Sequence, residues 1–254
     1  MPIMLKSEAE LDTMREAGRI VGQTLAGIRE MVRPGLNLLD VEAYVSEQFK
    51  RHGAIETFRG YDPAGKPPYP SNFCASVNEE LVHGIPTDRL LEEGDIVTFD
   101  LGATYKGFVG DSAITVAVGE ISPEARRLME VTEGALWAGI EAMGTGTHLN
   151  DVSAAIEDAI PEEYSIVREY TGHGVGRTMH EEPQVPNYRR RFRGPPLKPG
   201  LVLALEPMVN IGTRYTRELD DSWTVATEDG SLCCHFEHTI AIRKGQRPEV
   251  LTLP

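Results

Sequence analysis

Residues 94–111, GDIVTFDLGATYKGFVGD, have the pattern of two β-strands joined by a tight turn. β-Branched and aromatic residues on both sides favour strands, and a glycine near the turn can adopt positive φ. Centring the turn between Tyr105 and Lys106 predicts that Asp100 faces Asp111. Because like charges opposed across two strands are destabilising, we expect a divalent cation between them. The alternative is two solvated aspartates beside a hairpin whose register a bulge has changed.

A second stretch repeats the first in outline. The spacing L-x-x-G-x5-[D/E] occurs at 91–100 and again at 197–206, and each time an apolar run ends in a carboxylate. Two segments with the three-and-four apolar spacing of helices precede each set of strands. We therefore predict an α+β fold of two related halves, about 1–120 and 121–254, in which antiparallel strands are covered by helices. No long linker separates the halves, so residues 1–254 are expected to form a single domain.

The expected helices have recognisable starts. A capping box at residues 7–10 opens the first helix, and the second is expected to begin near Asn37 or Asp40. Proline at the first helical position marks the third helix after Ser122, and a fourth is expected from about Asn150.

Composition limits the class of partner. The chain of 254 residues has a formal charge of −14 and a pI near 5.0, which argues against nucleic acid or an anionic membrane as its main partner. No apolar run has membrane-spanning length, and the first residues lack the hydrophobic segment of a signal peptide. Cys74, Cys233 and Cys234 have no disulfide or zinc-finger spacing. We therefore expect reduced thiols and a cytoplasmic protein.

Three histidines stand where the backbone can present them to a ligand. His173 and His180 belong to the segment TGHGVGRTMH, whose glycines disfavour a helix and allow close approach. His83 is expected at the end of a short strand, where the ordinary role of a lone histidine is a structural hydrogen bond.

The last strands are expected at 223–227 and 235–242, paired with each other across a turn at 228–230. Side chains alternate along a strand, so His235 and Glu237 should share one face.

These stretches supply four acidic side chains: Asp100, Asp111, Glu206 and Glu237. Four carboxylates in one core would not all ionise without cations. Two divalent metals bridged by carboxylates would neutralise them and activate a water. Oxygen ligands with an imidazole suit Mn, Fe(II) or Co better than a thiolate zinc site. The sequence therefore predicts two divalent metal ions as cofactors.

Several motifs carry a resemblance to a known family: GDIVTFD, GFVGD, TGHGVGRTMHEEPQVPNY, LEPMVN, DSWTVAT and FEHTIAI. They resemble those of the type I methionine aminopeptidases, and the likeness covers nearly the whole chain. The resemblance implies the pita-bread fold, a dinuclear metal site, and removal of the initiator methionine when the second residue is small. It also implies that the partner is the N-terminal methionine of nascent polypeptides at the ribosome. We expect a monomer.

The resemblance assigns metal ligands by motif. These would be Asp100, Asp111, His173, Glu206 and Glu237. Asp111 and Glu237 would bridge both ions, and Asp100 would bind one ion with both oxygens. A hydroxide activated by the two ions would attack the peptide.

The resemblance also assigns substrate contacts. His83 would contact the scissile amide, His180 would hydrogen-bond the scissile carbonyl, and Glu206 would pass a proton to the leaving amine. The methionine side chain would enter an apolar pocket, since a polarisable lining suits a thioether. Its residues would be Tyr69, Cys74, Met179 and Trp223, with Phe58 and Tyr61 on its wall.

The chain departs from the family pattern at several positions. Val109 stands where histidine is usual, Met179 replaces a more common phenylalanine, and the loop 62–68 is longer than expected. His235 stands where glutamine usually comes two residues before the final glutamate. Because it should share a face with Glu237, we expect His235 to hydrogen-bond a ligand carboxylate and orient it.

Two other functions are compatible with parts of this pattern. A proline-type aminopeptidase or dipeptidase of the same fold usually carries a further N-terminal domain, whereas only 99 residues precede Asp100 here. A non-catalytic binding relative would have lost metal ligands, whereas all five positions are intact.

Overall fold

The computed structural model describes residues 2–63 and 65–254. Its helices are α1 (Glu8–Met31), α2 (Leu38–His52), α3 (Pro123–Thr145) and α4 (Leu149–Asp158). The strands between the two helix pairs are β1 (Ile55–Glu56), β2 (Cys74–Val77), β3 (Glu80–Val82), β4 (Ile96–Tyr105) and β5 (Phe108–Ala117). The strands after α4 are β6 (Ser165–Ile166), β7 (Gly172–Gly174), β8 (Glu181–Val185), β9 (Val202–Leu205), β10 (Met208–Asn210), β11 (Thr216–Glu218), β12 (Val225–Thr227), β13 (Cys233–His235), β14 (His238–Ala241) and β15 (Glu249–Val250).

The helix boundaries follow the capping signals of the sequence. Ser7 and Glu10 form the predicted capping box, in which the Ser7 side chain accepts from the Glu10 amide. Asn37 caps α2, and Ser122 caps α3 with Pro123 in its first turn. The predicted starts of these three helices are therefore confirmed.

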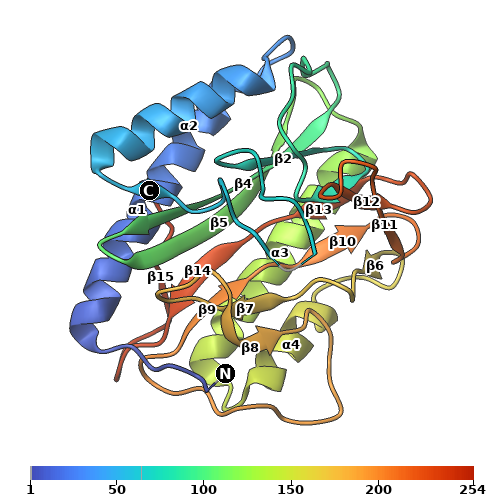
Figure 1. The fold of residues 1–254 in the computed structure, drawn as a ribbon. Helices are drawn as coiled ribbons and strands as arrows, with labels where there is room; N and C mark the ends of the chain where they lie inside the picture. The colour runs from blue at the N-terminus through green and yellow to red at the C-terminus, as the bar shows by residue number, and fades with distance from the viewer. Residues whose placement is uncertain (1, 64) are drawn as a thin grey trace.

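All strand pairs in the described part of the chain are antiparallel. One sheet has the order β1-β4-β2 with β5 on β4, and another has the order β15-β14-β9-β7-β8. Two smaller sheets, β13-β10-β6 and β11-β12-β3, complete the set. In Figure 1, α1 and α2 lie against the strands of the first half, and α3 lies behind those of the second. The predicted architecture, antiparallel sheets covered by helices with the same element order in both halves, is confirmed.

The β4–β5 hairpin differs from the prediction in its register. Tyr105 pairs with Phe108, so Asp111 lies opposite Gly102 and not opposite Asp100. The turn consists of Lys106 and Gly107, with φ of 48° and 78°, as in the two-residue hairpin turns that match strand twist. The prediction that Asp100 faces Asp111 was wrong by two residues. A shift of two keeps both side chains on the same face of the sheet, because side chains alternate with a period of two.

The repeated spacing corresponds to a repeated backbone feature. Gly94 and Gly200 both have left-handed φ, 94° and 89°, and each ends the turn that leads into a strand. The strands are β4, which contains Asp100, and β9, which Glu206 follows directly. Glycine is required at both turns because other residues rarely adopt this φ.

The last strands do not pair with each other as predicted. β12 already has β11 on one edge and β3 on the other, so neither of its edges is free. The chain turns back at Gly230 and continues as β13, which pairs with β10, and β14, which pairs with β9.

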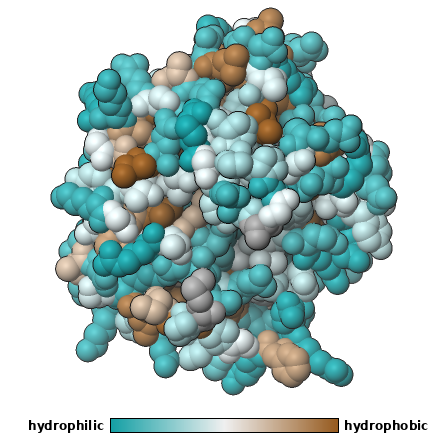
Figure 2. Space-filling model, in the orientation of Figure 1, coloured by the Kyte–Doolittle hydropathy of each residue, from teal (hydrophilic) through white to brown (hydrophobic). Residues whose placement is uncertain are grey.

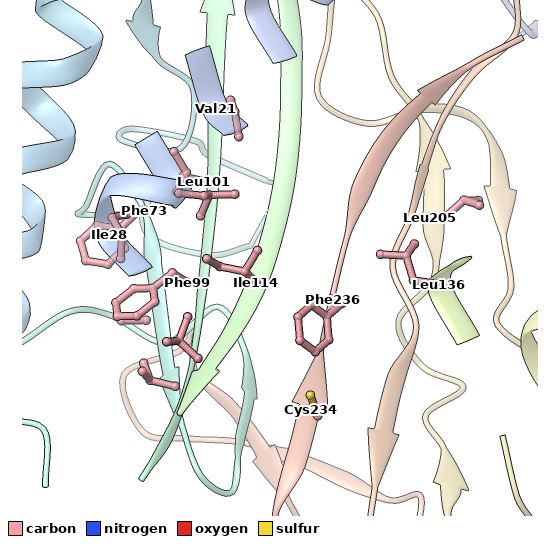
Figure 3. Close-up of a cluster of buried hydrophobic side chains, with 14 of the residues drawn as sticks. Val21, Ile28, Phe73, Phe99, Leu101, Ile114, Leu136, Leu205, Cys234 and Phe236 are labelled. Carbon is pink, nitrogen blue, oxygen red and sulfur yellow. The ribbon is translucent and has the colours of Figure 1, made fainter. Parts of the chain in front are cut away.

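The core joins α1 to both halves of the strand layer. Figure 3 shows Val21 and Ile28 of α1 facing Leu101 and Ile114 of the hairpin. The same buried cluster continues to residues of the second half, among them Leu136, Leu205, Cys234 and Phe236.

Close packing brings α1 onto β5 one residue before Asp111. A side chain at Gly110 would place its Cβ 2.6 Å from the Gly18 amide nitrogen. The helix can therefore lie directly on the strand that carries the aspartate.

The surface is mixed. On the face in Figure 2, hydrophobic residues form separate small patches within a mostly hydrophilic surface. None of the helices in the described ranges is long and apolar enough to cross a membrane.

Candidate metal centre and active site

Strand pairing brings acids from distant parts of the chain to one place. Backbone hydrogen bonds in both directions join Ala113 of β5 to Glu237. The Thr239 hydroxyl also accepts from the Asp111 amide at 3.2 Å and donates to the Asp111 carbonyl at 2.7 Å. Asp111 in β5 is thereby held beside Glu237, which lies between β13 and β14.

The second half contributes an imidazole and a further carboxylate. His173 in β7 pairs with Ala204 of β9, two residues before Glu206. The His173 Nε2 atom lies 3.5 Å from a Glu206 carboxylate oxygen. One potential ligand atom each from Asp111, His173 and Glu237 lie within 4.8 Å of one another. This spacing is compatible with shared binding of a cation.

His173 is held in the tautomer that metal binding requires. Its Nδ1 atom lies 3.0 Å from the Gly174 carbonyl oxygen, which can only accept a hydrogen bond. Nδ1 therefore carries the proton, and Nε2 offers its lone pair toward Glu206. Burial lowers the pKa of His173 to about 3, so the imidazole is neutral at physiological pH.

The carboxylates lack protein partners. One oxygen each of Asp100, Asp111 and Glu237 is buried without a hydrogen-bond partner among the described residues. Burial raises the pKa of Asp111 to about 7, and it raises the pKa values of Asp100, Glu206 and Glu237 well above their ordinary range. Mutual repulsion among the carboxylates adds to the increase for these three. Unpaired oxygens and a neutral imidazole form a donor set that fits divalent cations.

Cys74 is not a competing ligand. Burial raises the pKa of its thiol well above the ordinary value, with a further increase from Asp100. The ligand atoms that lie within 4.8 Å of one another come from Asp111, His173 and Glu237, so this group of donors is oxygen and nitrogen.

A cavity of about 400 Å³ opens onto these residues. Every residue predicted to bind metal or substrate lines it: Phe58, Tyr61, Tyr69, Cys74, His83, Asp100, Asp111, His173, Met179, His180, Glu206, Trp223 and Glu237. His235 does not line the cavity and lies behind Glu206, with its Nε2 atom 3.8 Å from a Glu206 oxygen. Neither His235 nitrogen has a hydrogen-bond partner in the described structure, so the hydrogen bond expected from His235 to a ligand carboxylate is not formed there, and Glu206 is the carboxylate within 4 Å.

One wall of the cavity is apolar. Phe58, Tyr69, Cys74 and Trp223 form a buried cluster, against which Tyr61 and Met179 pack. The Tyr69 and Trp223 rings meet edge to face with centroids 5.1 Å apart. The Tyr69 hydroxyl donates to the Gly84 carbonyl at 2.8 Å, which fixes the ring.

Three histidines line the cavity: His83, His173 and His180. The rings of His173 and His180 have centroids 4.4 Å apart, and the His180 Nδ1 atom lies 3.0 Å from the Tyr61 hydroxyl. Burial lowers the pKa of His180, so its neutral ring can accept at Nδ1 from Tyr61 and donate from Nε2. His83 follows β3 with a left-handed φ of 61°, and its ring is 6.3 Å from that of Trp223.

With this geometry established, comparison with known proteins is informative. A model of metallopeptidase family M24 matches residues 12–244. The chain belongs to this family. Methionine aminopeptidase 1 of Bacillus subtilis is 48% identical over 241 residues, which are 94% of this chain and 95% of that protein. The methionine aminopeptidase of Clostridium acetobutylicum is 44% identical over 253 residues, 99% of both chains.

Solved structures of the family agree. The methionine aminopeptidase of Thermotoga maritima superposes with a TM-score of 0.94 at 40% identity, over the full length of both chains. The prolidase of Pyrococcus furiosus has a TM-score of 0.75 at 22% identity and is covered over only 65% of its length, so it shares the fold alone. These likenesses confirm the predicted pita-bread fold and do not favour the proline-peptidase alternative.

The sequence did not single out several residues of this M24 cavity. Pro63, Lys66, Tyr170, Thr171 and Glu218 also line it. Tyr170 and Thr171 directly precede Gly172 and His173, so their position in the sequence could have indicated that they lie in the cavity. Lys66 and Glu218 form an ion pair at the cavity, although they come from segments far apart in sequence. No local sequence pattern indicates such a contact.

Proposed function

We propose that this M24 metallopeptidase removes the N-terminal methionine from newly made polypeptides when the second residue is small. One observation carries the proposal: a cluster of buried carboxylates with unpaired oxygens lies beside an apolar pocket in the same cavity. The full-length similarity to proteins named methionine aminopeptidase supports the same activity.

We propose that Asp100, Asp111, His173, Glu206 and Glu237 hold two divalent ions, with Mn, Fe(II) or Co suited to the donors. When bound, such ions polarise a carbonyl and lower the pKa of a water. Asp111 and Glu237, held side by side by the backbone bridge between Ala113 and Glu237, would be shared by both ions. Glu206 would carry a proton toward the leaving amine, because its carboxylate faces the cavity beside His173.

Two of the three histidines that line the cavity, His83 and His180, would act on the substrate peptide. His180 would donate from Nε2 to the scissile carbonyl oxygen, since Tyr61 occupies its Nδ1 atom. A donor placed where negative charge develops contributes about 3 kcal/mol to catalysis in comparable sites. His83 would contact the scissile amide. Burial lowers its pKa to about 4, so it would be neutral and able both to donate and to accept.

The apolar wall would receive the methionine side chain. A straight thioether fits a lining of Tyr69, Cys74, Met179 and Trp223, with Phe58 and Tyr61 at its edge.

We further propose that residues 1–254 form one catalytic domain that acts as a monomer in the cytoplasm on chains emerging from the ribosome. Free, buried thiols at Cys74, Cys233 and Cys234 support a reducing location.

The decisive experiment measures hydrolysis of Met-Ala-Ser, Met-Leu-Ser and an Xaa-Pro peptide by the purified protein with added Mn, Fe(II) or Co. We expect rapid release of methionine from Met-Ala-Ser only, and none after exhaustive chelation. Equal rates on Met-Ala-Ser and Met-Leu-Ser would contradict the rule for the second residue. Preferred cleavage of the Xaa-Pro peptide would favour a proline peptidase.

A further inference from the structure

One charged side chain of the cavity has no part in the chemistry proposed above. Lys66 belongs to the long loop between Tyr61 and Tyr69 and lines the same cavity as the acids. Its ammonium group does not pair with any of the proposed ligand carboxylates in the described structure. It is directed instead at the segment that carries Trp223.

Four contacts join this loop to that segment. The Lys66 ammonium forms an ion pair with Glu218 and donates to the Ser222 carbonyl oxygen at 2.9 Å. The same ammonium lies 5.2 Å from the centroid of the Trp223 ring. The Trp223 indole in turn donates to the Pro67 carbonyl oxygen at 3.0 Å. Two consecutive loop residues thus contact one tryptophan and the turn before it.

These contacts act on the wall of the apolar pocket. Trp223 is 5% exposed, and its ring meets Tyr69 on one side and His83 on another. Lys66 and Pro67 contact it from the loop and so oppose movement of the ring away from the pocket. Removing Lys66 would free that side of the ring without removing any pocket-lining aromatic group.

The contacts of Lys66 and Pro67 with Glu218, Ser222 and Trp223, here called the clamp, also act on the turn before Trp223. Ser222 has a left-handed φ of 66°, which is unfavourable for a residue with a side chain. Asp221 accepts from the Trp223 and Thr224 amides, both at 2.8 Å, and so fixes the turn from within. The donation from Lys66 to the Ser222 carbonyl fixes it from the loop.

The energetic scale of the clamp is moderate. The Lys66 and Glu218 side chains are 30% and 45% exposed, so water weakens their ion pair. A cation over a tryptophan face is the more favourable contact, because tryptophan has the strongest ring quadrupole. Together the contacts are suited to holding a wall in place, and they are too weak to determine whether the chain folds.

We propose that Lys66 is a specificity-determining residue, which fixes the Trp223 wall and so limits the length of the side chain that the pocket accepts. The proposal rests on the methionine-removing function proposed above. The ion pair between Lys66 and Glu218 argues against a simpler role for Lys66, that of an unpaired cation which binds a substrate carboxylate.

The first test compares two peptides that differ by one methylene. We would measure kcat/KM for Met-Ala-Ser and for ethionyl-Ala-Ser with the metal-loaded wild type, Lys66→Ala, Lys66→Arg and Lys198→Ala. Lys198 is exposed and forms no ion pair in the described structure, so its replacement makes the same change in charge as a matched control. One methylene in an apolar pocket allows roughly 10- to 200-fold discrimination. We expect Lys66→Ala to reduce the preference for methionine on the order of 3- to 10-fold, the range set by one cation–π contact and a half-exposed ion pair. Lys66→Arg should retain most of it, and Lys198→Ala all of it.

The second test measures tryptophan fluorescence, which reports on the surroundings of Trp223 without substrate. The chain has two tryptophans, so a Trp137→Phe background leaves Trp223 as the only tryptophan. Trp137 is 40% exposed and lies in α3, outside this cavity. In this background Lys66→Ala should shift the Trp223 emission to the red in the metal-free protein, and Lys198→Ala should not.

The outcomes separate the two proposals. Lys66→Ala with the same methionine preference as Lys198→Ala would overturn the specificity role, whether or not the emission shifts. If the wild type cleaved neither peptide, the proposed function would fail, while the emission test would still report whether Lys66 holds Trp223. A shifted emission together with a reduced preference, retained by Lys66→Arg, would support the proposal.

Discussion

The two sides of the cavity are built differently. The acidic side comes from backbone of both halves, in which the β4–β5 ladder positions Asp111 and an isolated backbone bridge from Ala113 positions Glu237, between β13 and β14. The apolar side comes largely from the loop before β2 and the turn before β12, which side-chain contacts such as Lys66 with Glu218 join together. The difference indicates that the chemistry is determined by strand pairing, whereas selectivity is determined by contacts between loops that can vary without disturbing the strands.

The largest effect is expected on the acidic side. Asp111→Asn and Glu237→Gln keep side-chain volume and remove the charge, so each should lower kcat/KM for Met-Ala-Ser by at least about 10³-fold. Asp220→Asn removes an exposed carboxylate and serves as the control. If His173→Ala were far more damaging than either replacement, a shared role for Asp111 and Glu237 in binding both ions would be wrong.

The acidic side was readable from sequence because its signals are local. Asp100 and Glu206 each end an apolar run that follows a glycine turn, and the repeated spacing marks both copies of that arrangement. The register error of two residues left Asp100 and Asp111 on one face, since side chains alternate. The pairing of the last strands was less accessible, because it depends on which edges of β12 are already occupied.

The apolar side was only partly readable. Its aromatic residues came from the family resemblance, and the structure places them in one cluster. The contacts that position them, such as Trp223 with Pro67, join segments about 150 residues apart and have no periodic signal. No propensity rule predicts such a meeting between two loops.

The second prediction concerns stability in the metal-free protein. The buried carboxylates have raised pKa values, whereas burial lowers the pKa values of the buried histidines: His83, His173, His235 and His238. Above about pH 7.5, one unit beyond the ordinary histidine pKa, the histidines are mostly neutral in both folded and unfolded states, so the groups with raised pKa values, the buried carboxylates and thiols, determine the pH dependence. There the folded protein binds more protons than the unfolded chain, and the free energy of unfolding falls as pH rises.

Scanning calorimetry of chelated protein from about pH 7.5 to about pH 9 measures this effect, because unfolded histidines are mostly neutral over that range. We expect the Tm to fall as pH rises, and to fall less in Asp111→Asn, which removes one of the contributing carboxylates. Added Mn should raise the Tm more at the upper end, because deprotonated carboxylates bind cations more strongly. A Tm that is constant across this range in the chelated wild type would show that the carboxylates ionise there without metal.

The third prediction concerns His235, behind the acidic side. Its Nε2 atom is 3.8 Å from Glu206, and burial lowers its pKa to about 3, so it is a neutral potential donor. We expect His235→Ala to weaken metal binding by calorimetry on the order of 10-fold, as for other residues that orient a ligand. His235→Gln should retain most of the affinity, because an amide can donate to the same carboxylate. An affinity unchanged in His235→Ala would exclude the orienting role, and a loss of binding in His235→Gln would indicate that His235 binds metal directly.

The smallest effect is expected where the two sides meet. Tyr61→Phe keeps the ring against the apolar cluster and removes the hydroxyl that lies 3.0 Å from the His180 Nδ1 atom. A neutral hydrogen bond contributes about 0.5–1.5 kcal/mol, so kcat should fall about 2- to 10-fold. The preference for Met-Ala-Ser over ethionyl-Ala-Ser should stay unchanged, because the pocket keeps its shape.

Lys66→Ala is the counterpart of this variant, since it should change that preference and leave kcat for Met-Ala-Ser near the wild-type value. If Tyr61→Phe altered the preference as well, a change in the orientation of His180 would also change the shape of the pocket. Catalysis by the acidic side and selectivity of the apolar side would then not be independent, because Tyr61 contacts both His180 and the apolar cluster.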